Sequence, residues 1–249
     1  MAHDEDMDDL VSEDAEQAAL WQALEELVQL GQQAPTEALA RFASLPEEVQ
    51  CLVDFQLVQA GLLRASGEPH TARKLLEALI AIDRDEADAH HLLGDVLEEL
   101  GEFARAREHF LETLRIDALA SAQRDNEELE QILDVTLEHL RNTIEELPEA
   151  WRERLQGVPL LVQRLPSEDM VRSGLDPRAL GLFEGPLHAD TEGLDSAPLP
   201  TRIVLFAENL ALDFPDPDDF EEQVRITVLH ELGHFFGLDE DDMVRLGLD

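Results

Sequence analysis

The most informative stretch of the chain is PDPDDFEEQVRITVLHELGHFFGLDEDDMVRLGLD, residues 215–249. Asp216 followed by Pro217 is typical of a helix start. Proline fits the first helical turn, and the carboxylates that follow it are favourable at the positive end of the helix dipole. Gly237 is a natural helix stop, because glycine adopts the left-handed conformation that commonly ends a helix. We therefore predict a helix from about Pro217 to Gly237.

This helix contains the motif His230-Glu231-Leu232-Gly233-His234. Residues four apart lie on one helical face, so the imidazoles of His230 and His234 can bind one Zn²⁺. Glu231 is rotated by about 100° from His230, which puts its carboxylate beside the metal. From there it can take a proton from a zinc-bound water and pass it to a leaving amine. The alternative is a helix with two ordinary surface or core histidines.

Gly233 is unusual inside a helix, where glycine costs about 1 kcal/mol relative to alanine. Such a glycine indicates a place where another segment approaches closely. We expect that segment to be the backbone of the strand predicted at residues 201–207.

The third metal ligand is expected just after the helix. Only 15 residues follow His234, which leaves little room for a ligand on a separate later helix. The pattern HExxHxxGxx resembles the metzincin layout, in which a ligand follows the glycine. Counting along that layout puts Glu240 at the third-ligand position, and a carboxylate is sound zinc chemistry. The alternatives are a solvated helix end without a ligand, or a ligand from one of the flanking residues Asp241, Asp239 and Asp242.

Composition excludes several classes of function. The 249 residues include 18 basic and 57 acidic ones, for a formal charge of −39. Such a polyanion is a poor candidate for binding nucleic acid, because phosphate contacts need Lys and Arg, and anionic membranes are disfavoured for the same reason. The single cysteine, Cys51, permits no internal disulfide and no thiolate metal cluster. Without a secretory signal or a membrane-spanning run, the expected location is cytoplasmic.

The N-terminal half has a period of 34 residues. Small residues and large apolar residues recur with this spacing, the first at Ala38, Ala72 and Ala106 and the second at Phe42, Leu76 and Phe110. A period of this length indicates an array of helical hairpins, in which small residues allow close helix contact and apolar residues fill the seams. The alternative is an ordinary α-helical bundle.

The best copy of the period is residues 87–117. Its Leu93-Gly94 pair, Gly101 and Phe110 fall where the tetratricopeptide consensus places them. The segment therefore resembles a tetratricopeptide array, and the resemblance implies a surface that binds a peptide or a protein partner.

Beyond the repeats, residues 125–155 are predicted to be helical, with one apolar face. The runs VPLLVQRLP (158–166) and TRIVLFAENL (201–210) read as strands. Between them lies a stretch rich in Gly, Pro and Asp, which reads as loop except for a third possible strand in ALGLFEGPL (179–187). The second half is therefore α+β, with a boundary near residue 125.

This second half resembles the small bacterial minimal zincins, metallopeptidase-like domains of the zincin group. The resemblance covers about residues 125–245 and rests on the helix ending in Leu147-Pro148, on LGLFEGPL, on LPTRIVLF and on HELGHFFGLDEDD. It implies a compact α+β domain with the motif helix beneath a small mixed sheet. It also implies that the strand at 201–207 aligns a peptide by main-chain pairing. The family usually has Asp where Glu240 stands, a difference of one methylene.

Zincins commonly stabilise the tetrahedral oxyanion with a Tyr or His opposite the glutamate. This chain has no tyrosine. The remaining candidates are His188, in the loop before the strand, Arg178, or a backbone N–H.

The predicted architecture has three parts and an α+β fold. An acidic, mobile tail (1–14) precedes a tetratricopeptide-like helical array (15–124), and a minimal zincin-like domain with a mixed sheet and an active-site helix follows (125–249).

The predicted function is that of a zinc-dependent peptidase. Zn²⁺ is expected on His230, His234 and Glu240, with Glu231 activating a metal-bound water, and the repeats are expected to recruit a protein substrate or partner. The alternative is a non-catalytic scaffold that binds metal and protein.

Overall fold

The computed structural model describes the backbone of residues 5–185 and 201–246. Side chains are described for residues 17–185, 201–239 and 241–245. No helix within these ranges is both long and apolar enough to cross a membrane. The chain divides into two compact units, Met1–Ile116 and Asp117–Asp249.

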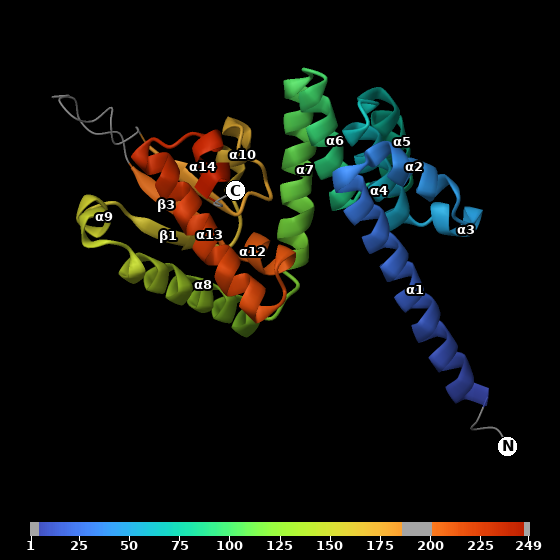
Figure 1. Ribbon diagram of the computed structural model, residues 1–249, viewed down its shortest axis with the longest axis horizontal. Helices are drawn as coiled ribbons and strands as arrows, with labels where there is room; N and C mark the ends of the chain where they lie inside the picture. Colours follow the sequence, from blue (N-terminus) through green and yellow to red (C-terminus); the bar gives the residue numbers. More distant parts are fainter. Residues whose placement is uncertain (1–4, 186–200, 247–249) are drawn as a thin grey trace. The chain divides into compact units, whose positions relative to one another are not determined.

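The described residues of the first unit form helices and the turns between them (Figure 1). Consecutive helices pack against each other, as α1 does with α2, α4 with α5, and α5 with α6. The helices are α1 (Glu5–Gln33), α2 (Pro35–Ala43), α3 (Glu47–Gln50), α4 (Val53–Ala65), α5 (Pro69–Ile82), α6 (Ala87–Glu99) and α7 (Phe103–Ser121), the last of which continues into the second unit.

Helix α1 begins inside the segment that we expected to be a mobile acidic tail. The backbone of residues 5–14 is helical.

The residues that recur every 34 positions form the core of this unit. Ala38, Ala72 and Ala106 are fully buried, as expected for residues that let neighbouring helices approach. Their large apolar counterparts Phe42, Leu76 and Phe110 are also buried. The prediction of a repeated helical hairpin from this spacing is therefore confirmed.

Two glycines of the same period end helices. Gly67 and Gly101 have φ angles of 79° and 75°, in the left-handed region that favours glycine. Each lies just beyond a helix, α4 or α6, and its N–H bonds back to a carbonyl of the last turn, that of Arg64 or Glu98. The 34-residue spacing of these glycines thus marks the turn between the two helices of a hairpin.

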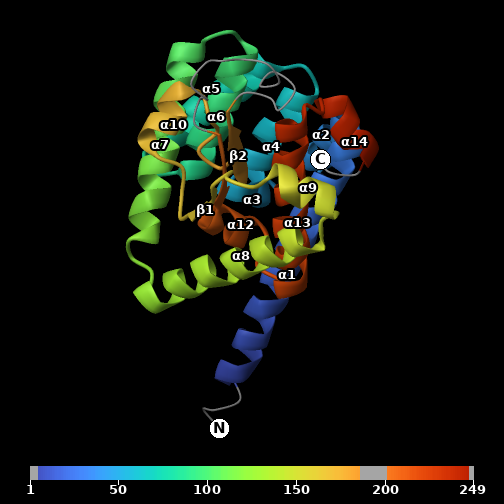
Figure 2. The ribbon, with the colours of Figure 1, turned by 90° about the vertical axis from the view of Figure 1, so that its left-hand side faces the viewer.

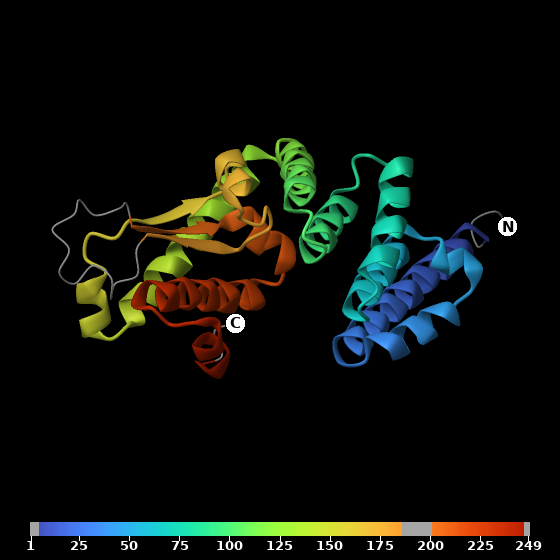
Figure 3. The ribbon, with the colours of Figure 1, turned by 90° about the horizontal axis from the view of Figure 1, so that it is seen from above.

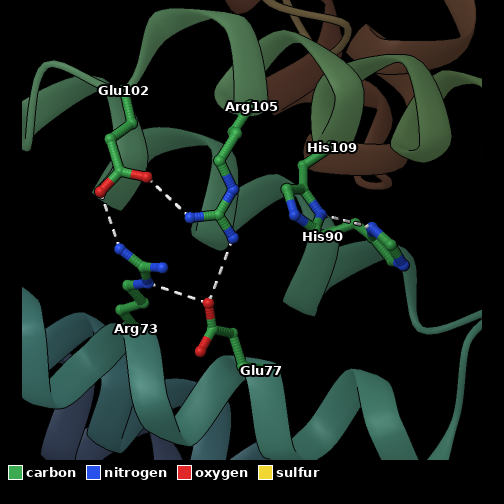
Figure 4. Close-up of polar contacts among 6 residues, drawn as sticks. All are labelled: Arg73, Glu77, His90, Glu102, Arg105 and His109. Atoms are coloured by element: carbon green, nitrogen blue, oxygen red, sulfur yellow. Dashed lines mark hydrogen bonds and ion pairs between the residues drawn. The ribbon is translucent and has the colours of Figure 1, made fainter.

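Polar side chains also join the helices of this unit (Figure 4). Arg73 on α5 donates to Glu77 and to Glu102, and Arg105 on α7 donates to the same two carboxylates. These ion pairs lower the pKa of Glu77 and Glu102, through hydrogen bonds from Arg73 and Arg105 respectively. The four residues form a closed ring that ties α5 to the start of α7.

Beside this ring, two imidazoles meet between α6 and α7 (Figure 4). Nδ1 of His90 lies 2.9 Å from Nδ1 of His109, and Nε2 of His90 lies 3.2 Å from the carbonyl oxygen of Arg84. His90 is buried. With Nε2–H of His90 donating to that carbonyl, Nδ1 of His90 is left to accept a hydrogen bond from Nδ1–H of His109, so the contact requires the ring of His90 to be neutral.

The second unit combines helices with a three-stranded sheet. Its strands are β1 (Leu160–Gln163), β2 (Gly181–Glu184) and β3 (Arg202–Phe206). Its helices are α8 (Asn126–Glu146), α9 (Glu149–Arg154), α10 (Glu168–Ser173), α12 (Ala207–Asp213), α13 (Pro217–Phe236) and α14 (Glu240–Leu246). The expected α+β class, with a small mixed sheet beside the helix that carries the motif, is confirmed.

Strand β3 lies in the middle of the sheet. The order is β1-β3-β2, with β1 parallel and β2 antiparallel to β3. Both edges of β3 are therefore used within the sheet. The expectation that this strand aligns a peptide by main-chain pairing is wrong, because its main-chain groups already pair with β1 and β2.

Two helices lie where the sequence suggested other structure. Helix α10 interrupts the expected loop after β1, and its start is capped by Ser167, whose side chain accepts from the N–H of Met170. Helix α12 replaces the last part of the strand expected at 201–210, so the strand ends at Phe206.

Helix α13 runs along one face of the sheet (Figures 2 and 3). Ile203 and Leu205 of β3 point to this face and share a core with α8 and α13. Val204 and Phe206, which alternate with them along the strand, point to the opposite face and are also fully buried. The sheet is therefore covered on both faces, and α13 is held in place by one of them.

The contact between α6 and α7 predicts an asymmetry between two helical glycines. A Cβ on Gly94 would lie 2.4 Å from the Phe110 ring, whereas a Cβ on Gly61 has nothing within 4 Å. Gly94→Ala should cost about 1–3 kcal/mol by overpacking. Gly61→Ala should stabilise by up to about 1 kcal/mol. The free energy of unfolding in urea measures both changes, provided that its dependence on urea concentration has the same slope in each variant. Equal effects of the two substitutions would contradict the packing of Gly94 against Phe110.

The His90–His109 contact predicts acid sensitivity. Burial, together with the neighbouring His90, lowers the pKa of His109 from 6.5 to about 4, and burial also lowers that of His90. Below pH 6.5 the unfolded chain takes up protons that the folded chain accepts only near pH 4. The stability that this pair contributes should be complete above pH 6.5 and should be lost as the pH falls from 6.5 to about 4.

The measurement is the free energy of unfolding between pH 7 and 4, for the wild type and for a His90→Leu/His109→Leu variant. The two proteins share every carboxylate, so their difference isolates the imidazoles. The variant should show the shallower loss of stability on acidification. Parallel curves would mean that the imidazoles titrate normally in the folded protein.

Candidate metal centre

Helix α13 has the boundaries that the sequence predicts. Oδ1 of Asp216 accepts from the N–H groups of Asp218 and Asp219, at 2.9 and 3.4 Å. At the other end Gly237 has a φ of 84°, and its N–H bonds to the carbonyl of His234. The helix therefore starts and stops at local signals, which fixes the motif in its last two turns.

The two motif histidines face each other one helical turn apart. Their Nε2 atoms are 3.0 Å apart and their ring centroids 4.7 Å apart. A tetrahedral zinc ion with Zn–N bonds of about 2.0–2.1 Å holds two nitrogens about 3.3 Å apart. The two imidazoles fit a shared zinc ion after only a slight opening of the pair.

Glu231 lies on a different side of the helix, against strand β2. Its side chain is 7% exposed. A Cβ on Gly181 would lie 3.0 Å from Cγ and Oε1 of Glu231 and 2.8 Å from Cγ2 of Thr227. Only a residue without a side chain lets β2 approach α13 this closely. Gly181 could not be identified from the sequence, because no local pattern shows that helix α13 packs against it.

Met243, and not the strand at 201–207, packs against Gly233. A Cβ on Gly233 would lie 2.3 Å from Cε and 2.4 Å from Sδ of Met243, which is itself fully buried. The expectation that the strand backbone fills this place is wrong, because α14 folds back onto the end of α13 and inserts its methionine there.

The candidates for the third ligand have different roles in the structure. Asp239 and Asp242 cap α14 reciprocally, since the N–H of Asp242 donates to Oδ1 of Asp239 and the N–H of Asp239 to Oδ2 of Asp242. Asp241 is exposed. Glu240 is the first residue of α14, but its side chain lies outside the described residues.

Among the described side chains, no third histidine, cysteine or carboxylate lies within 4.8 Å of the ligand nitrogens of both motif histidines. Glu240 is not in that set, so its assignment stays a prediction.

The two side chains considered for oxyanion stabilisation also differ. His188 lies outside the described residues. Arg178 is described, and its guanidinium holds both carboxylate oxygens of Asp117, at 3.1 and 3.2 Å. This bidentate ion pair leaves Arg178 committed to a structural contact.

Two parts of the chain match known protein families. Residues 155–248 match the family model described as a zincin-like metallopeptidase. Residues 63–128 match the model described as a tetratricopeptide repeat. The expected order, helical repeats followed by a zincin-like domain, is confirmed. A search of the curated proteins found no match.

The zincin-like match contains all of β1, β2, β3 and α13, together with the three motif residues His230, Glu231 and His234. The repeat match contains α5, α6 and α7, the helices joined by the ion-pair ring and the imidazole contact.

The close approach of β2 to α13 predicts the effect of a single methyl group. Gly181→Ala should destabilise the protein by about 1–3 kcal/mol, because the new Cβ overlaps Thr227 and Glu231. Thr227→Ser removes the overlapping methyl and keeps the hydroxyl that bonds to the carbonyl of Gln223. In a double-mutant cycle this second change should recover part of the loss, and strict additivity would contradict the contact.

Proposed function

We propose that this protein is a zinc-dependent peptidase whose helical repeats bring a protein substrate or partner to the zincin-like domain. One observation carries the proposal. His230 and His234 meet at their Nε2 atoms, and the buried Glu231 lies between them in sequence, under strand β2. A purely structural zinc site has no use for that glutamate.

The donor set is suited to catalysis with zinc. His230 and His234 would hold the ion, with Glu240 as the proposed third ligand and Asp241 as the alternative that caps nothing. Bound zinc lowers the pKa of a coordinated water to about 7 and polarises a carbonyl. With zinc bound, the carboxylate of Glu231 would accept a proton and pass it to the leaving amine, so that one carboxylate would act first as base and then as acid.

Strand β2 is the proposed platform for the substrate, in place of β3. The N–H of Phe206 donates to the carbonyl of Leu180, so Leu180 and then Leu182 form hydrogen-bonded pairs with β3. The main-chain groups of Gly181 and Phe183 therefore point away from β3. Within the described residues no strand pairs with this outer edge, and an extended peptide can add there.

The outer edge of β2 passes directly over Glu231. Because Gly181 approaches Oε1 of Glu231 so closely, a peptide paired with this strand would have its backbone near the proposed base. The strand edge thus supplies alignment, and α13 supplies the chemistry.

The alternative function is a metal-binding scaffold without catalysis. It is favoured by two observations: the chain has no tyrosine, and the guanidinium of Arg178 is held by Asp117. On this alternative the zinc ion only stabilises the fold, and the repeats alone carry the function.

Metal analysis and hydrolysis together separate the two functions. The purified full-length protein should hold about one zinc per chain. His234→Gln should abolish zinc retention, because it removes one of two imidazole ligands. Glu231→Gln should keep the zinc and lower peptide hydrolysis by at least about 100-fold, the size of a general acid–base contribution.

Asp218→Asn serves as the matched control. It changes an exposed carboxylate in the first turn of the same helix, far in sequence from the motif, and should leave zinc content and hydrolysis unchanged. Zinc retained by His234→Gln would contradict the metal site. Zinc bound with no hydrolysis of any peptide would favour the scaffold.

A further inference from the structure

A cavity of about 560 Å³ lies in the second unit, on the far side of the sheet from α13. Helix α10 and the turn that follows it form one wall, and β2 and β3 form the other. The residues that matter for its chemistry are Asp169, Met170, Leu175, Leu182, Glu184 and Arg202. The metal centre uses none of them.

This cavity and the metal centre share one strand. Gly181 and Phe183 of β2 point towards α13, where Gly181 meets Glu231 and Phe183 meets Phe235. Leu182 alternates with them and so points to the opposite face, where it lines the cavity. One short strand thus separates the proposed base from the cavity.

An extended peptide on the outer edge of β2 continues the same alternation. Its side chains point in turn to the face that carries α13 and to the face that carries the cavity. Every second side chain beside β2 is therefore directed towards α10. A cavity of this volume at that place can take a large side chain.

The lining favours one class of side chain. Glu184 is paired with Arg202 across β2 and β3, so their charges offset each other. Asp169 is exposed and, among the described residues, has no cationic partner, in contrast to its neighbour Glu168, which pairs with Arg172. Met170, Leu175 and Leu182 add apolar surface beside this carboxylate.

A lysine or arginine side chain matches both features. Its aliphatic stem packs on apolar surface while its charged head stays in contact with water and a carboxylate.

We propose that this cavity is a specificity pocket that selects a basic side chain of the substrate, with Asp169 as the residue that recognises it. The inference rests on the peptidase function proposed above. Helix α10, which contains no recognised motif, would then determine the substrate specificity.

The test uses extended peptides in which Lys, Gln or Glu is placed in turn at every position. Cleavage is measured with the wild-type full-length protein. Binding is measured separately with the zinc-loaded Glu231→Gln protein, so that recognition is observed without hydrolysis. An exposed ion pair contributes up to about 1 kcal/mol, so Lys should be preferred over Gln by up to about fivefold at one or more positions, and Glu should be disfavoured.

Three variants identify the residue responsible. Asp169→Asn should remove the preference for Lys, and Asp169→Lys should turn it into a preference for Glu. Glu168→Gln is the matched control: it makes the same change of charge one residue away, outside the cavity, and should keep the preference. Both positions, 168 and 169, are exposed, so we expect folding to be preserved.

The outcomes distinguish this inference from the proposed function. Cleavage without a preference for Lys, or with a preference that survives in Asp169→Asn, overturns the proposed specificity pocket. The proposed peptidase function is then still supported. Binding that prefers Lys through Asp169, without cleavage by the wild type, supports the pocket and overturns the peptidase. Neither cleavage nor binding of any peptide overturns both.

Discussion

The candidate site depends on how helix α13 is buried. Val224, Val228 and Leu232 are fully buried and lie in one stripe along the helix, against the sheet and α8. Each helical residue is rotated by about 100° from the one before it, so burying this stripe fixes the direction of every other side chain. His230 and His234 then share a half-buried face. The imidazoles can meet at one metal because the apolar core holds the helix in a single orientation.

Two glycines let other segments reach this helix. At Gly181 the absence of a side chain brings the edge of β2 to within contact of Glu231, and at Gly233 it makes room for Met243 of α14. The first contact places the outer edge of β2, with which no described strand pairs, over the proposed base. The second holds α14, which begins with Glu240, against the end of the motif helix. Close packing at two points thus joins the proposed substrate platform, the proposed base and the proposed third ligand.

Features that depend on local signals could be predicted from the sequence. Contacts between segments far apart in the chain could not. The ends of α13 follow from Asp216 and Gly237, and the helical repeats follow from a period that places small residues in every seam. The position of β3 between two partners has no local mark, because pairing joins segments far apart in the chain. For the same reason Gly233 was assigned the wrong neighbour, and Gly181, whose role depends on Glu231, was missed.

The central claim is that two imidazoles and one carboxylate of this chain hold a zinc ion. X-ray absorption at the zinc edge of the full-length protein tests it directly. We expect two imidazole nitrogens at about 2.0–2.1 Å, with the remaining ligands oxygen at about 2.0–2.2 Å. Replacing Glu240 by Ala should remove one protein oxygen and weaken zinc retention, whereas the same change at Asp241 should not. A zinc spectrum without imidazole scattering, or a protein that retains no zinc, would contradict the account.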